Sequence, residues 1–208
     1  MLTKENRAQG SAEQVSSAKP APRKKLSVRR ILLGILAVLA AAVAVLLIVV
    51  AMQPTDFRIT RSAKISASPP AVFEQVNDFH NWQQWSPWAK LDPNAKSTFE
   101  GPSSGEGAIF RWAGNAEIGE GNMTITQSQP SERVKLKLEF IKPFADTADT
   151  EFTFQPEGDQ TVVTWTMAGK NNFMAKAFCL FMDMDKMLGG QFEEGLANMK
   201  AAVESKKN

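Results

Sequence analysis

The stretch RVKLKLEF, residues 133–140, has the most regular pattern in this chain of 208 residues. Every second residue is apolar and the residues between are Lys or Glu, so the two faces of an extended strand would differ in polarity. This alternation predicts an antiparallel sheet with one face in the core and the other in water. The apolar positions are Val134, Leu136, Leu138 and Phe140.

Further strands are predicted around this stretch, because alternating or apolar runs recur between turn signals such as GPSSGEG and QPEGDQ. By the same parity, Phe110 shares a face with Trp112, and Trp165 shares a face with Met167. The additional predicted strands cover residues 57–67, 108–114, 123–128, 150–154 and 161–167.

Helical segments are predicted before and after the main run of strands. Ser68-Pro69-Pro70 is expected to open a short helix, because Ser can cap a helix and Pro is tolerated in the first turn. Residues 172–204 are expected to form one long helix, since apolar residues recur there every three or four positions. Gly189-Gly190 interrupts this helix and predicts a kink or a close approach to the sheet.

The order of these elements resembles a known superfamily. It is carried by SPPAVFEQVNDFHNWQQWSPW at residues 68–88, by GAIFRWAGN with the GEGNMTI that follows it, by TVVTWTMAG, and by the terminal helix. Over about residues 57–204 the chain resembles the SRPBCC, or START-like, proteins, in their polyketide cyclase/dehydrase and lipid-transport branch. The resemblance implies an α+β helix-grip fold over residues 57–206, with a curved antiparallel sheet of about seven strands around the long C-terminal helix.

The same resemblance implies an apolar pocket between the sheet and the last helix, for a lipid or for a polycyclic, aromatic or similar small molecule. The alternative is a solid core, because protein interiors are normally close-packed. The tryptophans of NWQQWSPW, residues 81–88, either plug the junction between the short helices and the sheet or line the rim of the pocket. The candidate ligand-binding residues are Trp85, Trp88, Phe110, Trp112, Leu138, Phe140, Trp165, Met167, Met184, Leu188 and Phe192.

The segment FMAKAFCLFM, residues 173–182, is apolar around most of a helix circumference, and Lys176 is its only charge. Part of it must therefore face something other than the sheet. Met174, Phe178 and Met182 are predicted to form a pocket lip or to touch the bilayer or a partner. The competing explanation is that this segment packs under the loop around Phe144.

Residues 31–52 contain no charged and no strongly polar side chain. As a helix they would rise about 33 Å at 1.5 Å per residue, which matches a hydrocarbon core of about 30 Å. A transmembrane anchor is therefore predicted. The alternative is a cleaved signal peptide, with Val49-Val50-Ala51 as its cleavage site, although the apolar stretches of secretory signals usually span only about 7 to 15 residues.

The charge around this stretch predicts its orientation. Residues 1–30 hold eight Lys or Arg and two Glu, while the whole chain is only +2, so residues 31–208 carry a net charge of −4. The basic tail, predicted to be disordered, would stay in the cytoplasm by the positive-inside rule. The chain would then be a single-pass protein of the inner or plasma membrane with its C-terminal domain in the periplasm or outside the cell. Nucleic acid is not expected as a partner, because the folded part lacks net positive charge.

Few residues offer catalytic or metal chemistry. The chain has one cysteine, Cys179, and one histidine, His80, which excludes cysteine-based and multi-histidine metal sites. Cys179 is predicted to be a core thiol and His80 a surface or capping residue. Glu117 and Glu120 lie three apart near a hairpin and are expected to be solvated rather than an acid/base pair. No cofactor, metal or catalytic residue is therefore expected.

Three functions remain open at this stage, because a fold alone does not fix a function. The first is a membrane-anchored module that binds or shuttles a hydrophobic small molecule or lipid in an apolar cavity. The second is a protein-interaction domain with a filled core. The third is a cyclase- or dehydratase-type enzyme, which would need an ionisable group inside the cavity.

Overall fold

A computed structural model of the chain describes residues 28–205. The chain divides into two compact units between Val45 and Leu46, and each is described here by itself. The predicted basic tail, residues 1–30, lies almost entirely outside the described residues.

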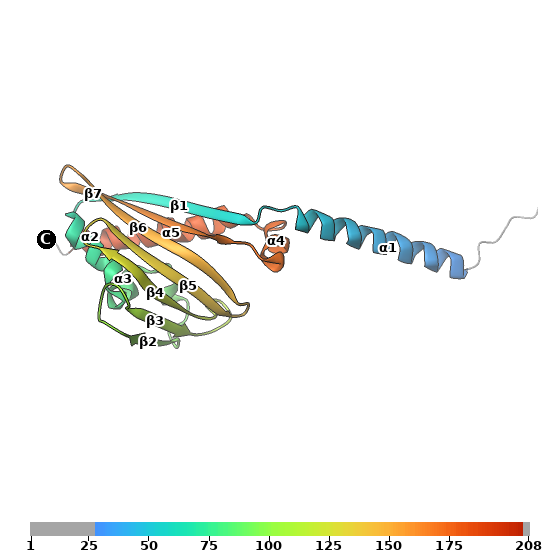
Figure 1. The fold of residues 1–208 in the computed structure, drawn as a ribbon, viewed down its shortest axis with the longest axis horizontal. Helices are drawn as coiled ribbons and strands as arrows, with labels where there is room; N and C mark the ends of the chain where they lie inside the picture. Colours follow the sequence, from blue (N-terminus) through green and yellow to red (C-terminus); the bar gives the residue numbers. More distant parts are fainter. Residues whose placement is uncertain (1–27, 206–208) are drawn as a thin grey trace, which may run out of the picture. The chain divides into compact units, whose positions relative to one another are not determined.

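The second unit is built on one seven-stranded sheet in the order β1-β7-β6-β5-β4-β3-β2, with every neighbouring pair antiparallel (Figure 1). The sheet curves around the C-terminal helix, so the predicted helix-grip fold is confirmed. The strands are β1 (Asp56–Ile65), β2 (Lys96–Glu100), β3 (Ile109–Ala113), β4 (Glu120–Gln129), β5 (Arg133–Lys142), β6 (Asp146–Glu157) and β7 (Gln160–Lys170).

The alternation in RVKLKLEF is confirmed, because Val134, Leu136 and Leu138 are buried on the inner face of β5. Phe140 continues the same face but remains 37% exposed. Residues paired across antiparallel strands share a face of the sheet. One row across the inner face therefore runs through Phe110, Met123, Leu138, Ala148, Gly169 and Phe57.

Short helices between β1 and β2 close one side of the core. Ser68 precedes the first of them with extended backbone but makes no side-chain capping bond. Trp82 and Trp85 are buried, and their indole N–H groups donate to the carbonyls of Val76 and Gln75, both at 2.9 Å. Trp88 lies in a further turn of helix that begins at Pro87. These elements are α2 (Pro69–Asn77), η1 (Phe79–Asn81), α3 (Trp82–Trp85) and η2 (Pro87–Lys90).

The predicted single helix over residues 172–204 is wrong, because the structure divides it into α4 (Phe173–Cys179) and α5 (Met184–Glu204). The Asp183 carboxylate accepts a hydrogen bond from the Lys186 N–H at 3.1 Å and thereby caps the start of α5. α5 continues without a break through Gly189-Gly190. Only α5 lies inside the curved sheet. α4 lies at one end of the sheet, near the ends of β1 and β7 (Figure 1).

The helix α1 (Val28–Ala51) carries the long apolar stretch of the sequence. It is the one helix within residues 28–205 that is long and apolar enough to cross a membrane. Nearly all of its side chains are exposed, and only Val50, close to its C-terminal end, is buried. A signal sequence near the N-terminus can also form an apolar helix, so α1 is a candidate membrane span.

Candidate functional site

The middle of the grip is filled with aromatic rings. The Trp165 ring from β7 stacks on the Phe192 ring of α5, with 4.0 Å between centroids and 6° between planes. Trp85 meets Trp165 edge to face at 5.7 Å. All three side chains are at most 1% exposed. A void large enough for water would leave exposed area on its walls, so these predicted lining residues lie in the packed interior and not along an open wall.

Burial changes along α5, and this change divides the grip into a closed half and a looser half. Phe192, Leu196 and Met199 are buried in the closed half. Leu188 and Met184, about one and two turns before Phe192, are only half-buried, and both belong to the predicted lining. The remaining space for a ligand is therefore expected beside the first two turns of α5.

Four rings form a continuous strip on the sheet beyond the closed half, and we call it the aromatic strip. Its centroid distances are 5.3 Å from Phe99 to Phe110, 6.0 Å from Phe110 to Trp112 and 6.3 Å from Trp112 to Phe140. The two end rings are exposed and the two middle rings are half-buried. The Trp112 indole N–H donates to the carbonyl of Ile118 at 3.0 Å, which fixes the ring. Phe99 was not among the predicted residues, because its short strand has no clear alternation.

The other predicted lining residues lie around this strip. Leu138 and Met167 are buried on the inner face of the sheet. Trp88 is half-buried, and its indole N–H donates to Gln191 of α5 at 3.2 Å. The structure thus gathers Phe110, Trp112 and Phe140 into one surface, while Trp88 joins the short helices to α5.

Two open depressions occur at the α4 end of the domain. One, of about 550 Å³, contains the end ring of the aromatic strip, Phe140, together with Glu139, Asp146 and the helix-capping Asn172. The other, of about 450 Å³, is formed by residues 179–184 of the link between α4 and α5. Cys179 lines it and is half-buried in α4, so the prediction of a core thiol is wrong.

Among the buried side-chain polar atoms that have no hydrogen-bond partner within the described residues, two lie on the inner face of the sheet. They are the Trp165 indole Nε1 and the Thr150 hydroxyl, on neighbouring strands of the inner face. Phe152 pairs with Trp165 and Thr150 pairs with Met167, so Thr150 and Trp165 are diagonal neighbours across the two strands. Buried polar groups nearly always find a partner, so these two unpaired groups lower the stability of the packed core.

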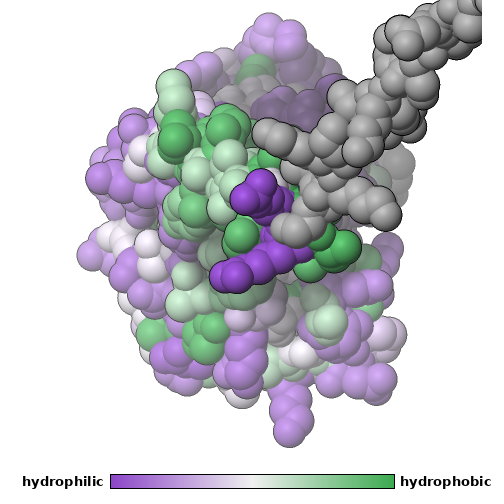
Figure 2. Space-filling view, turned by 90° about the vertical axis from the view of Figure 1, so that its right-hand side faces the viewer, coloured by the Kyte–Doolittle hydropathy of each residue, from purple (hydrophilic) through white to green (hydrophobic). Residues whose placement is uncertain are grey.

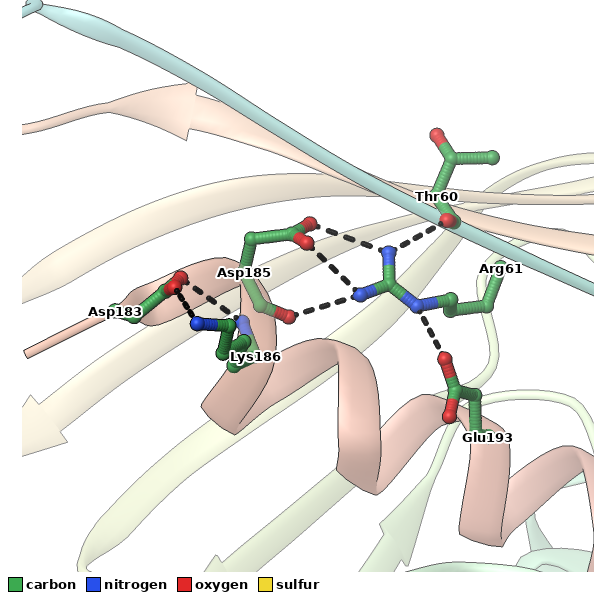
Figure 3. Close-up of polar contacts among 6 residues, drawn as sticks. All are labelled: Thr60, Arg61, Asp183, Asp185, Lys186 and Glu193. Atoms are coloured by element: carbon green, nitrogen blue, oxygen red, sulfur yellow. Dashed lines mark hydrogen bonds and ion pairs between the residues drawn. The ribbon is translucent and has the colours of Figure 1, made fainter.

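Arg61 is the one cation on the inner face of β1, and it joins the sheet to the start of α5 (Figure 3). Its Nη2 and Nη1 donate to the Asp185 carboxylate at 2.9 and 3.2 Å, and its Nε donates to Glu193 at 2.7 Å. Nη1 and Nη2 also donate to the backbone carbonyls of Thr60 and Asp185. These contacts occupy the donors of the guanidinium, so Arg61 holds α5 in place and is not free to bind a ligand anion.

Gly189 lets this guanidinium approach the helix. A Cβ at position 189 would overlap the Arg61 side chain, whereas a Cβ at Gly190 would meet nothing within 4 Å. Of the two outcomes predicted for the glycine pair, the structure therefore shows the close approach, and it comes from Gly189. The sequence held a signal for this arrangement, since Arg61 falls on the apolar parity of β1 together with Ile59 and Ile65.

The Arg61–Asp185 pair predicts a pH-dependent contribution to stability. The hydrogen bond from Arg61 holds the pKa of Asp185 below its ordinary value. A carboxyl whose pKa is lower in the folded state adds stability above its unfolded pKa, near 4, and loses it as the pH falls through the folded value. Asp185→Asn is therefore expected to lower the urea midpoint at pH 7 and to have no effect once Asp185 is protonated.

The comparison of wild type with Asp185→Asn isolates this pair from the other acidic groups that titrate in the same range. A high salt concentration should shrink the difference at pH 7, because the Asp185 side chain is exposed. An equal difference between the two proteins at acidic and neutral pH would contradict the assignment.

The other candidate groups have structural partners. His80 Nδ1 lies 2.7 Å from the Asp78 carboxylate, and its ring stacks on Phe99 at 4.1 Å. Glu120 forms an ion pair with Lys142, and Glu117 is exposed in the turn before β4. Lys137 donates to Glu139 and holds the pKa of Glu139 below its ordinary value. A carboxyl with a lowered pKa is a poor general acid at neutral pH.

The family of the chain is identified by a sequence model that matches the whole domain. The sequence model of the family described as polyketide cyclase / dehydrase and lipid transport matches residues 56–204, from the first residue of β1 to the last residue of α5. The chain belongs to this family. The predicted SRPBCC membership is thereby confirmed. Among curated proteins, none is significantly similar in sequence to this chain.

Solved structures with the same fold are distant in sequence. Protein CV1439 from Chromobacterium violaceum has a TM-score of 0.51 and 16% identity, over 73% of this chain and 99% of its own. The Aha1 dimer from Colwellia psychrerythraea has a TM-score of 0.53 and 17% identity, over 73% of this chain and 99% of its own. Protein Ms6760 from Mycobacterium smegmatis has a TM-score of 0.52 and 15% identity, over 72% of this chain and 92% of its own. At these identities the likeness establishes that this family member has the helix-grip fold, and nothing more.

Proposed function

We propose that the domain binds a hydrophobic small molecule or lipid on the aromatic strip. The observation that carries the proposal is the strip itself, four contiguous rings of which the two at the ends remain exposed. Contiguous exposed apolar surface marks binding sites more often than chance placement does. The membership in a family described by polyketide cyclisation and lipid transport agrees with an apolar ligand.

The packed half of the grip limits how deep the proposed site can reach. Phe192 and Trp165 are stacked on each other and are closed to a ligand. Ligand sites are mostly apolar with a few polar groups that fix orientation. Because the strip presents ring faces, the proposed ligand has a flat or extended apolar body.

We further propose that α1 anchors the chain in the inner or plasma membrane, with the domain on the extracytoplasmic side. The support is the length and composition of α1, together with five basic residues just before the apolar stretch. Basic residues flanking a span remain in the cytoplasm in most single-span proteins.

The binding proposal is tested on the full chain, purified from its host in detergent and analysed by native mass spectrometry. We expect one small apolar molecule to accompany the protein. Trp112→Ala should lower the affinity for that molecule, or for a polycyclic aromatic probe, by about tenfold, because an aromatic pair contributes about 0.5–1.5 kcal/mol beyond the area that it buries. The matched control Phe181→Ala, an exposed ring outside the strip, should leave the affinity unchanged.

A protein-interaction function is the second candidate, because the centre of the grip is packed and an apolar patch is exposed at α4. A protein that carries no small molecule, and whose tryptophan fluorescence responds neither to fatty-acid nor to polycyclic probes, would refute the ligand proposal and favour this alternative.

A further inference from the structure

α4 is an apolar helix with no buried residue. A helix of seven residues has little stability alone in water, so its conformation depends on what it contacts. The exposed apolar side chains of α4 and the segment after it form a set that we call the α4 patch. Its members are Phe173, Met174, Phe178, Phe181, Met182 and Met187.

The α4 patch holds six of the large apolar side chains that the described chain exposes outside α1, whereas the aromatic strip exposes two. Hydrophilic residues form most of the rim of the view in Figure 2. Packing under the loop around Phe144 does not account for the patch, because Phe144 and the members of the patch are all exposed. Surfaces of soluble proteins normally carry exposed apolar residues singly, whereas the α4 patch groups six of them.

Hydrogen bonds tie the start of α4 to the few residues that follow α1. The backbone N–H of Asn171 donates to the Thr55 carbonyl at 2.6 Å, and its side chain donates to the Pro54 carbonyl at 3.3 Å. From within α4, the Lys176 ammonium donates to the Thr55 hydroxyl at 2.9 Å. These three contacts attach both the base and the middle of α4 to residues 54 and 55.

Chain length then limits how far α4 can be from the end of a span. α1 ends at Ala51, and the four residues to Thr55 reach at most about 14 Å when fully extended. The interfacial layer of a bilayer is about 5–8 Å thick on each side, and α4 itself is only about 10 Å long. An apolar patch fixed at this distance from a membrane exit lies within reach of the bilayer surface.

We propose that the α4 patch inserts into the interfacial layer of the bilayer that α1 enters, as a second membrane contact of the same chain. This inference rests on the proposed anchoring by α1. Phenylalanine and methionine side chains would enter the boundary between headgroups and acyl chains, while Lys176 stays at headgroup level, as in helices that lie in the membrane plane.

The test uses the full chain in phosphatidylcholine vesicles, with Cys179→Ser as background and a nitrobenzoxadiazole fluorophore on one introduced cysteine. Phe181→Cys and Met174→Cys place the fluorophore in the patch, where both side chains are well exposed and substitution should not disturb folding. Asp159→Cys places it in the β6–β7 turn, at the opposite end of the 11-residue strand β7 and about 33 Å away.

We expect the fluorophore at positions 181 and 174 to emit at shorter wavelength and to lose most of its emission when brominated lipids replace the ordinary ones. The fluorophore at position 159 should remain water-exposed and unquenched. Vesicles that retain the protein in alkaline carbonate but leave positions 181 and 174 unquenched would overturn this inference alone. Release of the protein by carbonate would overturn the anchoring, and the inference with it.

Discussion

Phe192→Ala is expected to lower the free energy of unfolding of the domain by about 3–5 kcal/mol, the cost typical of deleting a fully buried aromatic ring. Phe192 is 0% exposed, stacks on Trp165 and meets Trp88 edge to face. Domains are stable by only about 5–15 kcal/mol, so much of this variant should be unfolded at moderate denaturant concentration. The measurement is urea unfolding of the full chain in detergent micelles, followed by circular dichroism.

Phe181→Ala is the matched control, since it deletes the same ring from a position that is 79% exposed. Surface substitutions usually change stability by less than about 0.5 kcal/mol. A small change in the urea midpoint for Phe192→Ala as well would contradict close packing at the centre of the grip. It would indicate a cavity between Trp165 and α5.

Gly195→Leu is expected to destabilise the domain by about 1–3 kcal/mol, as overpacking of a filled core does. A Cβ at position 195 would lie 3.0 Å from the Trp165 ring and 3.1 Å from the Pro87 ring, which leaves no room for the rest of a leucine. Pro87 belongs to the helical turn η2, so the new side chain would push η2 and β7 away from α5.

Gly190→Leu is the control, because it changes the same residue type in the same helix where nothing lies within 4 Å. Leucine is a better helix former than glycine by roughly 0.8 kcal/mol, so this variant should be slightly more stable than wild type. Thermal melting of both proteins in the same micelles measures the effect. Two leucine variants that moved the melting temperature in the same direction would contradict the contact of Gly195 with Trp165.

The sequence pattern predicted the sheet well, because burial on one face forces strict alternation. RVKLKLEF is the clearest case, and the inner positions of β7 followed the same parity. The sequence pattern did not predict the short strand β2. All five of its residues are exposed, so no buried face imposes an alternation of apolar and polar residues on it.

The division of the C-terminal helix could not be predicted from apolar spacing, because Leu180, Phe181 and Met182 continue the apolar character of α4 across the break. The decisive residue is Asp183, whose capping bond to Lys186 starts a new helix. A capping residue inside an apolar run is a weak signal when the residues before it give no reason to stop the helix.

The candidate site was predicted only in part, for a physical reason. Large apolar side chains fill a core or line a pocket with the same residue types, and the distinction depends on whether facing rings meet. Trp165 and Phe192 meet, whereas Trp112 and Phe140 lie at the margin. The role of Arg61 was missed because it depends on Gly189, which comes 128 residues later in the chain.

The hydrogen bonds from Asn171 and Lys176 to residues 54 and 55 have a consequence for how the proposed ligand could be transferred. With α1 in a bilayer, the four residues from Ala51 to Thr55 would keep this end of the domain within about 14 Å of one leaflet. Such a domain cannot ferry a molecule across an aqueous compartment in the way that a freely diffusing carrier does. It would act as a stationary acceptor, so any donor or recipient on the far side must travel to it.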